Sequence, residues 1–414
     1  MNPFFSISVP TLGKLDQWKL ALQSVLDQTY KDFEIIAIDS GPEAHSRPLI
    51  ETLNDPRIRY INTSAKDPRL NWDTGFRNAR GTYMIWFEDD NYMLPWALAT
   101  LADVIQKTGA DLVTGSHVHW RGLTHPIAHA RNQLIIPQKG FSGTITKINP
   151  MTIIRDIVLT PEHDGAVPTR YGNSMSAAKR TLVLQVLERM HEINFGTTGT
   201  HALRLGLLAL ARNYQFIDTP VAIGANTGVS LSDVWPQQSS SVVTLPPFQY
   251  HLSAVTGNTY VNYRHENHLL MYHSFKDIRP DFPRDDEAIF LSIYRKELRY
   301  SKLSWTDFVR YWKELFRVLT HSPEVSVRKL SRSTMRYFFM ALAIKILRTL
   351  HLYEFLKRAL ENRRKSKKPK TIISLHPYGV TNIRECAQKL PKIIQRELNM
   401  SYEDFLGITP ARKR

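Results

Sequence analysis

A short apolar run that ends in three consecutive acids constrains the fold of this chain more than any other segment. Residues 83–87 read YMIWF, which has the length and composition of a buried β-strand. Glu88, Asp89, Asp90 and Asn91 follow directly. Adjacent carboxylates repel one another, and a divalent cation bound among them removes that repulsion. The segment therefore predicts a metal site at the end of a strand, with a solvated acidic turn as the alternative.

Alternating strand and helix patterns precede this segment. Strand-like runs occupy residues 4–9, 33–38 and 57–61, and helical patterns lie between them. Such alternation predicts a parallel sheet covered by helices on both faces. Asp39 and the acids at 88–90 then end their strands at the same edge of the sheet, which is where open α/β sheets bind ligands.

Four ordered motifs resemble those of family 2 glycosyltransferases with the GT-A fold. They are PT at 10–11, DSG at 39–41, WDTGFRNARGTY at 72–83 and EDDN at 88–91. The resemblance covers residues 4–116 well and 170–230 loosely. It implies a Rossmann-like, mostly parallel sheet with helices on both faces. It also implies an enzyme that moves a sugar from a nucleotide-sugar donor, most often a UDP-sugar, with Mn²⁺ or Mg²⁺ as cofactor.

The resemblance also implies roles for residues on the nucleotide side of the site. Pro10 and Thr11 would border the base, and Asp39 would accept a hydrogen bond from it. Asp73 would lie near the nucleotide.

The acidic turn corresponds to the DxD element of the family, in which the second acid binds the metal. Glu88 and Asp90 match its two acids, and Asp89 lies between them beside the donor. The family usually has Asp at the first position, so the Glu here leaves Asp90 as the principal metal ligand. A bound cation would act as a Lewis acid toward the departing diphosphate.

An inverting transferase also needs a general base near the acceptor hydroxyl. The family supplies an acid at the start of a helix, but residues 196–204 read GTTGTHALR and contain none. His201 and Asp164 are the candidates, because an imidazole titrates near neutrality and Asp164 lies in a loop that could cover the donor. The alternatives are a polar helix-start residue, a turn acid before Gly165, and a nucleotide-sugar-binding pseudoenzyme without a base.

A nucleotidyltransferase is the rival enzyme class, because it also combines an α/β sheet with a metal. It would be expected to show a Gly-rich, basic phosphate loop after the first strand. Residues 10–14 read PTLGK and contain one glycine. We therefore expect a glycosyltransferase that acts on a saccharide or lipid-linked acceptor in surface polysaccharide biosynthesis.

The chain divides by composition into three predicted regions. Residues 1–230 form the GT-A domain, 231–300 a polar linker or lid, and 301–414 a mainly helical basic region that includes an amphipathic helix at 305–319. Cys386 is the single cysteine, which suits a reducing compartment. The chain opens with no signal-peptide pattern, and its apolar stretches fall short of the roughly 18 residues of a spanning helix. These features predict a cytoplasmic protein.

The net charge of +16 is concentrated late in the chain. Residues 328–370 hold 14 Lys or Arg against two acids, beside an apolar run at 337–344. An apolar helix with a polybasic flank is typical of an interfacial membrane element, so we expect peripheral contact with the anionic inner face of the cell membrane. A packed helix with a solvated basic tail is the alternative. Nucleic-acid binding is not expected, because no recognised binding motif accompanies the charge.

Overall fold

The computed structural model describes most of the N-terminal half and the C-terminal end of the chain. The described residues are 2–63, 69–125, 128–159, 175–190, 199–226, 274–282 and 370–408, apart from Leu12 and Pro42, with separate residues between 305 and 352. The chain forms two compact units: unit 1 comprises Met1–Met151, Val167–Trp235 and Pro369–Arg414, and unit 2 comprises Thr152–Ala166 and Pro236–Lys368. The sheet described below belongs to unit 1.

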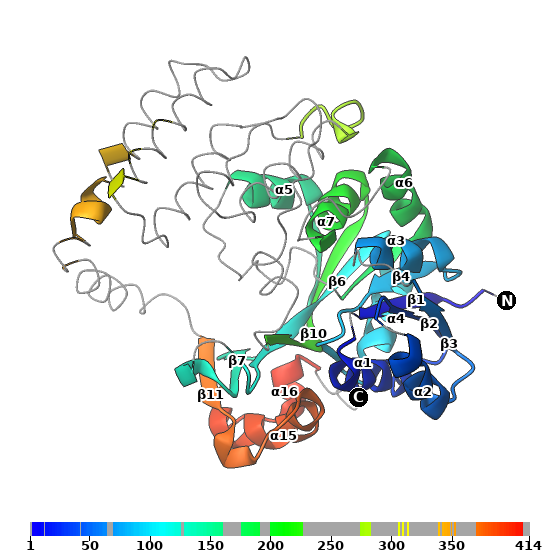
Figure 1. Ribbon diagram of the computed structural model, residues 1–414, viewed down its shortest axis with the longest axis horizontal. Coiled ribbons are helices and arrows are strands. Elements are labelled where there is room, and N and C mark those ends of the chain that lie inside the picture. The colour runs from blue at the N-terminus through cyan, green and yellow to red at the C-terminus, as the bar shows by residue number, and fades with distance from the viewer. Residues whose placement is uncertain are drawn as a thin grey trace, which may run out of the picture. The chain divides into compact units, whose positions relative to one another are not determined.

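The first half of unit 1 alternates strand and helix, as the sequence predicts. Four parallel strands lie in the order β3-β2-β1-β4 (Figure 1). They are β1 (Phe5–Thr11), β2 (Phe33–Asp39), β3 (Ile58–Asn62) and β4 (Tyr83–Trp86). The helices between them are α1 (Leu15–Leu26), α2 (Glu43–Leu53) and α3 (Arg69–Asn78). The predicted α/β class and the parallel order of its first strands are confirmed.

Antiparallel strands complete the sheet. β9 (Ser176–Lys179) lies antiparallel between β4 and β6 (Leu112–Arg121), so β6 runs in the same direction as β4. β10 (Tyr214–Asn226) pairs with β6 in parallel and contains a bulge after Ile217. Four shorter strands pair antiparallel with these or with one another: β5 (Tyr92–Met93), β7 (Gln133–Pro137), β8 (Ile145–Ile148) and β11 (Lys370–Ser374).

The side chains of β1 show how helices cover both faces of the sheet. Phe5, Ile7 and Val9 are buried in one core with residues of α1 and α4 (Ala97–Thr108). Ser8 points to the other face, where a Cβ on Gly75 of α3 would overlap its hydroxyl. Beside α3 on that face lie α6 (Arg180–Met190) and α7 (Gly199–Leu210), as Figure 1 shows. One further helix, α5 (Pro150–Leu159), follows β8.

The C-terminal segment closes a second core. α15 (Ile383–Leu398) and α16 (Tyr402–Leu406) follow β11, and a 3₁₀ turn precedes α15. Leu390 of α15 is fully buried in a cluster with Val118 of β6 and Ile223 of β10. The C-terminal segment therefore contributes a strand and a 16-residue helix to the sheet domain.

The compact units of the structure differ from the regions that the composition predicts. Residues 301–414 read as one basic helical region, whereas Pro369–Arg414 belong to the same unit as the sheet. The expected boundaries at 230 and 300 lie outside the described residues, and so does most of the amphipathic helix expected at 305–319. Those three expectations stay predictions.

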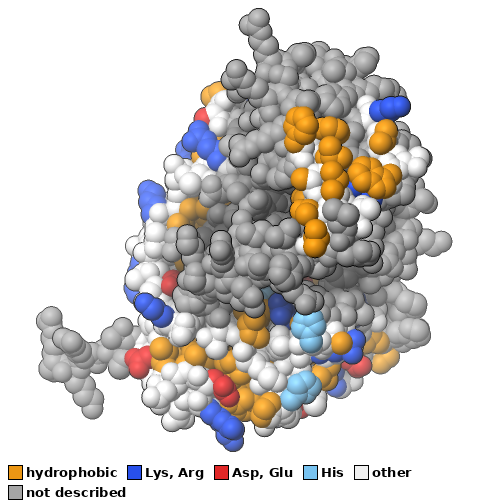
Figure 2. All heavy atoms as spheres, turned by 90° about the vertical axis from the view of Figure 1, so that its left-hand side faces the viewer, with side chains coloured by type: hydrophobic (Ala, Val, Ile, Leu, Met, Phe, Trp, Pro, Cys, Tyr) orange, Lys and Arg blue, Asp and Glu red, His pale blue; other side chains and the backbone are white. Residues whose placement is uncertain are grey.

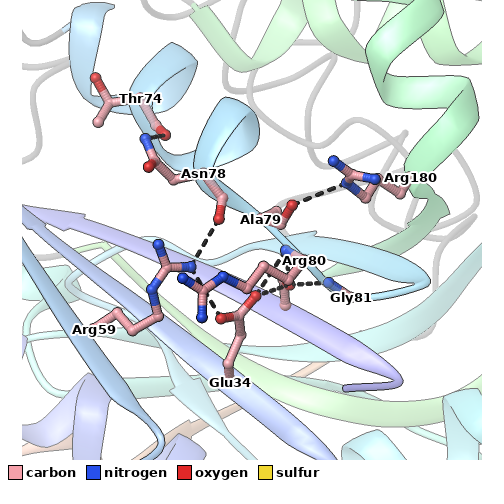
Figure 3. Close-up of polar contacts among 9 residues, drawn as sticks. Glu34, Arg59, Thr74, Asn78, Ala79, Arg80, Gly81 and Arg180 are labelled. Atoms are coloured by element: carbon pink, nitrogen blue, oxygen red, sulfur yellow. Dashed lines mark hydrogen bonds and ion pairs between the residues drawn. The ribbon is translucent and has the colours of Figure 1, made fainter. Parts of the chain in front are cut away.

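A buried carboxylate fixes the turn that leads into β4 (Figure 3). Glu34 of β2 is 7% exposed, accepts a 2.8 Å hydrogen bond from the Arg80 amide, and pairs with the Arg59 guanidinium at 3.1 Å. Arg180 Nε donates to the Ala79 carbonyl over 2.9 Å. Buried hydrogen bonds to a charged acceptor are among the stronger ones in proteins. These contacts fix the start of β4. They thereby also help to fix the position of the Glu88–Asp90 turn, which follows the other end of β4.

Candidate active site

The C-terminal ends of the parallel strands lie level with one another. Thr11 of β1 pairs with Asp39 of β2, and Asp39 pairs with Asn62 of β3. β4 lies next to β1, and Thr11 Oγ1 donates a 2.8 Å hydrogen bond to Asp89 Oδ2 in the turn that follows it. The structure thus brings the two acidic strand ends to the same edge, as the strand pattern predicts.

Asp39 is held in a fixed orientation at this edge. Its side chain is 1% exposed and accepts hydrogen bonds from Gly41 N (2.8 Å) and from Ser46 Oγ. A Cβ on Gly41 would lie 3.1 Å from Asp39 Oδ1, which explains why a residue without one follows at this spacing. Tyr60 shares a 2.9 Å hydrogen bond with the same serine. An ionised carboxylate accepts about four hydrogen bonds, so Asp39 retains capacity for a ligand donor.

The acidic turn is anchored on two sides. Thr11 holds Asp89 from the β1 side. On the other side Asn91 Nδ2 donates to Glu88 Oε2 over 3.0 Å, while Asn91 Oδ1 accepts a 3.1 Å hydrogen bond from the Ala225 amide of β10. These contacts fix the backbone between the two anchors, where Asp90 lies.

The two aspartates of the turn are electrostatically unfavourable in the absence of a ligand. Burial raises the pKa of Asp89, against the opposing charge of Lys14 and the Thr11 hydrogen bond. Burial, followed by the neighbouring charges of Asp89 and Glu88, holds the pKa of Asp90 well above its usual range. A cation placed among these carboxylates would stabilise their ionised forms.

The donor set fits a hard divalent cation. Carboxylate oxygens are ligands that Mg²⁺ and Mn²⁺ prefer, and these ions often keep only one or two protein carboxylates and complete their shell with phosphate and water. Among the residues that the structure describes, no group of three His, Cys, Asp or Glu side chains forms a closed metal site.

Two contributors to the site were not predicted from the sequence. Asn71, 1% exposed, donates to Ser40 Oγ (3.0 Å) and the Thr11 carbonyl (3.3 Å), and accepts from Thr63 Oγ1 (2.9 Å). It ties α3 to the ends of β1 and β2. An asparagine near a helix start normally indicates a cap, which hides this role. Lys14 is the second, and its only sequence signal is its position three residues after Thr11.

The remaining predicted residues lie in different places. Pro10 is buried in β1 beside Ile38. Asp73 lies on α3 and pairs with Arg77 one turn later at 3.6 Å. His201 is the third residue of α7, and its side chain is outside the described part of the structure, as is all of Asp164. The predicted roles of these residues in nucleotide binding and in base catalysis stay predictions.

The mixed sheet with its acidic edge defines a GT-A-type fold. S. aureus TarS, solved in complex with UDP-GlcNAc, superposes with a TM-score of 0.51 over 87% of this chain and 92% of that one. At 13% identity the likeness establishes the fold. Residues 6–177 match the family model described as Glycosyl transferase family 2. Over these residues the chain is similar to that family.

Sequence relatives with glycosyltransferase names match part of the chain. A Campylobacter jejuni protein named GalNAc(5)-diNAcBac-PP-undecaprenol beta-1,3-glucosyltransferase is 32% identical over 103 residues, 24% of this chain. The glycosyltransferase EpsJ of Bacillus subtilis is 30% identical over 115 residues, 27% of this chain. The matches span 33% of the length of each relative.

The raised pKa of Asp90 predicts a stability cost that metal relieves. A carboxyl whose pKa is raised by folding contributes stability below its unfolded pKa of about 3.9 and loses it as the pH rises through the native pKa. In EDTA at pH 7.5, the Asp90→Asn variant should therefore melt at a higher temperature than the unmodified protein, with the difference shrinking toward pH 4. Thermal unfolding across this pH range is the measurement. Equal melting temperatures at every pH would show that ionised Asp90 costs nothing.

Proposed function

We propose that this protein is a metal-dependent glycosyltransferase that takes its sugar from a nucleotide-sugar donor. The observation that carries the proposal is the arrangement at the carboxyl edge, where Asp39 and the Glu88–Asp90 turn lie on either side of Thr11. A nucleoside diphosphate has a hydrogen-bonding base at one end and a charged diphosphate at the other. Asp39 is a fixed carboxylate that can accept a hydrogen bond from the base, and a cation at the acidic turn could bind the diphosphate. Thr11, at the end of β1, lies between the two.

Each side chain has a role in this proposal. Asp39 accepts a hydrogen bond from the base, with Pro10 and Thr11 at its border. Asp90, helped by Glu88, holds Mn²⁺ or Mg²⁺, which when bound supplies Lewis-acid neutralisation of the leaving diphosphate. Asp89 is fixed by Thr11 and lies beside the donor.

The donor and acceptor classes are supported by the similar proteins. TarS binds UDP-GlcNAc, which favours a UDP-sugar here. The name of the Campylobacter jejuni relative states a diphosphate-linked polyprenol acceptor. We infer a saccharide or lipid-linked acceptor and a place in the assembly of a surface polysaccharide or glycolipid. The family match argues against the nucleotidyltransferase alternative.

The catalytic base in this proposal is Asp164 or His201. His201 lies in the first turn of α7, the helix position from which the family is expected to supply its base. Residues 196–204 contain no acid, and this observation favours a binding-only pseudoenzyme as the second candidate function. Donor hydrolysis or transfer would distinguish an active enzyme from that candidate.

Removing the metal ligand should abolish metal-dependent donor binding. Asp90→Ala is expected to reduce UDP binding in Mn²⁺ to the level that the unmodified protein shows in EDTA, because the diphosphate loses its bridging cation. Isothermal titration calorimetry with UDP measures this change. Asp103→Ala is the matched control, since Asp103 is an exposed acid on α4 paired only with Lys107 in the same helix. Unchanged affinity of Asp90→Ala in Mn²⁺ would contradict the metal assignment.

Removing the contact between Asp39 and the nucleotide base should weaken nucleotide binding both with and without metal. Asp39→Ala is expected to cost about 1.5–3 kcal/mol of UDP binding, the range for a hydrogen bond to a charged group. Ser46→Ala is the control, because it removes an internal partner of Asp39 and leaves the carboxylate in place. Calorimetry of both variants separates ligand binding from local packing. Equal losses in the two variants would mean that Asp39 only supports the fold.

We also infer that unit 2 contacts the membrane. Five large apolar side chains among the described residues of this unit are 44–59% exposed: Trp305, Val309, Phe339, Ile346 and Leu352. Figure 2 shows hydrophobic side chains gathered on one face of the molecule. Lys345 Nζ lies 5.5 Å from the Trp305 ring centroid, an aromatic–cation pair suited to a headgroup region. No described helix has the length and apolar character to span a bilayer. Peripheral contact at the inner membrane face is the proposal that follows.

Liposome co-sedimentation tests this contact. The full chain should bind vesicles containing phosphatidylglycerol at low salt, ignore neutral vesicles, and be released only partly by raised salt, because apolar burial is not screened. Phe339→Glu combined with Ile346→Glu should abolish binding, whereas Leu123→Glu, at an exposed apolar position of unit 1, should not. Equal binding by both variants would contradict the assignment. Truncation before residue 330 is unsuitable, because it removes the buried core residues of α15.

A further inference from the structure

The second half of β6 projects beyond the carboxyl edge of the sheet. Val113 pairs with Ala177, which pairs with Ile85 near the end of β4. The strand nevertheless continues to Arg121, pairing with β10. At about 3.3 Å per residue, the last seven residues extend more than 20 Å past the level at which β4 ends. This projection begins beside the acidic turn and leads away from it.

Alternating residues of the projection present two imidazoles and a guanidinium on one face. Val118 and Trp120 are buried against the C-terminal helices. Because side chains alternate along a strand, His117, His119 and Arg121 face the other way. His117 and His119 are half-exposed, with ring centroids 4.2 Å apart in an edge-to-face arrangement. Arg121 follows in the same row and donates from Nη1 to Gln133 Oε1 at 3.1 Å. These three residues are called the β6 row below.

The β6 row is joined to the acidic turn through a glycine of β10. Gly224 pairs with His119, and a Cβ there would lie 3.7 Å from atoms of both imidazoles. The same Cβ would lie 3.8 Å from Oδ1 of Asn91, whose Nδ2 donates to Glu88. Gly224 therefore lies within contact distance of both the row and the residue that anchors the turn.

We propose that the β6 row binds an anionic group of the acceptor, a phosphate or diphosphate that is distinct from the donor diphosphate. This inference rests on the proposed function, in which the donor phosphates are held at the turn. Imidazole N–H groups and a guanidinium are the donors that recognise phosphate oxygens, and the row spans about 13 Å, enough for a diphosphate. No described group of three ligating side chains includes these histidines, so the chemistry favours an anion over a second metal.

An anion in the row also complements the charge of the site. The donor and its cation lie at one end of the β6 row, and an acceptor phosphate in the row would be kept away from the carboxylates of the turn. The acceptor's hydroxyl would then be presented from the side of β6 and β10, opposite the base-binding Asp39. The row would thus determine acceptor specificity without touching the donor.

Imidazole NMR signals test the proposal directly. The full-length protein is labelled on histidine nitrogen and titrated in EDTA with farnesyl diphosphate, glycerol 3-phosphate and farnesol. His117→Gln and His119→Gln assign the two signals. Farnesyl diphosphate should shift both signals while the exposed His376 signal stays in place. The double variant should lose at least tenfold in affinity, and a His376→Gln control should lose none.

The three probes separate the sources of the phosphate. Shifts with both phosphorylated probes indicate a general phosphate site, and shifts with farnesyl diphosphate alone indicate a lipid-linked diphosphate; either supports the proposal. Equal shifts with farnesol, or none with any probe, would overturn it. Because neither donor nor metal is present, this result is independent of UDP binding at Asp90. The donor assignment and the β6 row can therefore fail separately.

Discussion

The burial of adjacent carboxylates at the end of β4 is the constraint on which the rest of the site depends. Desolvation opposes the ionised forms of Asp89 and Asp90, and the charges of Asp89 and Glu88 add to this effect at Asp90. Neighbouring groups must hold such a turn in place. Thr11 and Asn91 do the fixing, from β1 on one side and β10 on the other. The turn is therefore fixed at the edge of the sheet where we propose that a cation binds.

The supporting structure is spread over distant parts of the chain. At the amino edge, Glu34 and Arg59 fix the turn that starts β4. At the carboxyl edge, α3 delivers Asn71 between the ends of β1 and β2. α15 and α16 lie more than 250 residues after β6 in sequence. They pack against β6 and β10 in the second hydrophobic core. The proposed donor side and the proposed acceptor side of the site are thus supported by two different hydrophobic cores of one sheet.

The sequence predicted the parts of this structure that depend on local pattern. Apolar runs of strand length, separated by helical patterns, predicted that the first strands are parallel, and Asp39 and Glu88–Asp90 were expected at the edge where they lie. Asn71, Lys14 and the β6 row could not be recognised, because their meaning arises from contacts across strands rather than from neighbours in sequence. The packing of α15 on the sheet could not be predicted for the same reason, because it depends on contacts with strands far away in sequence.

A crystal structure with UDP and Mn²⁺ tests the central claim most directly. The account predicts one Mn²⁺ bound to Asp90 and to the diphosphate at about 2.0–2.3 Å, with the uracil ring at Asp39. A nucleotide that binds without Mn²⁺ at Asp90, or whose base lies away from Asp39, would contradict it.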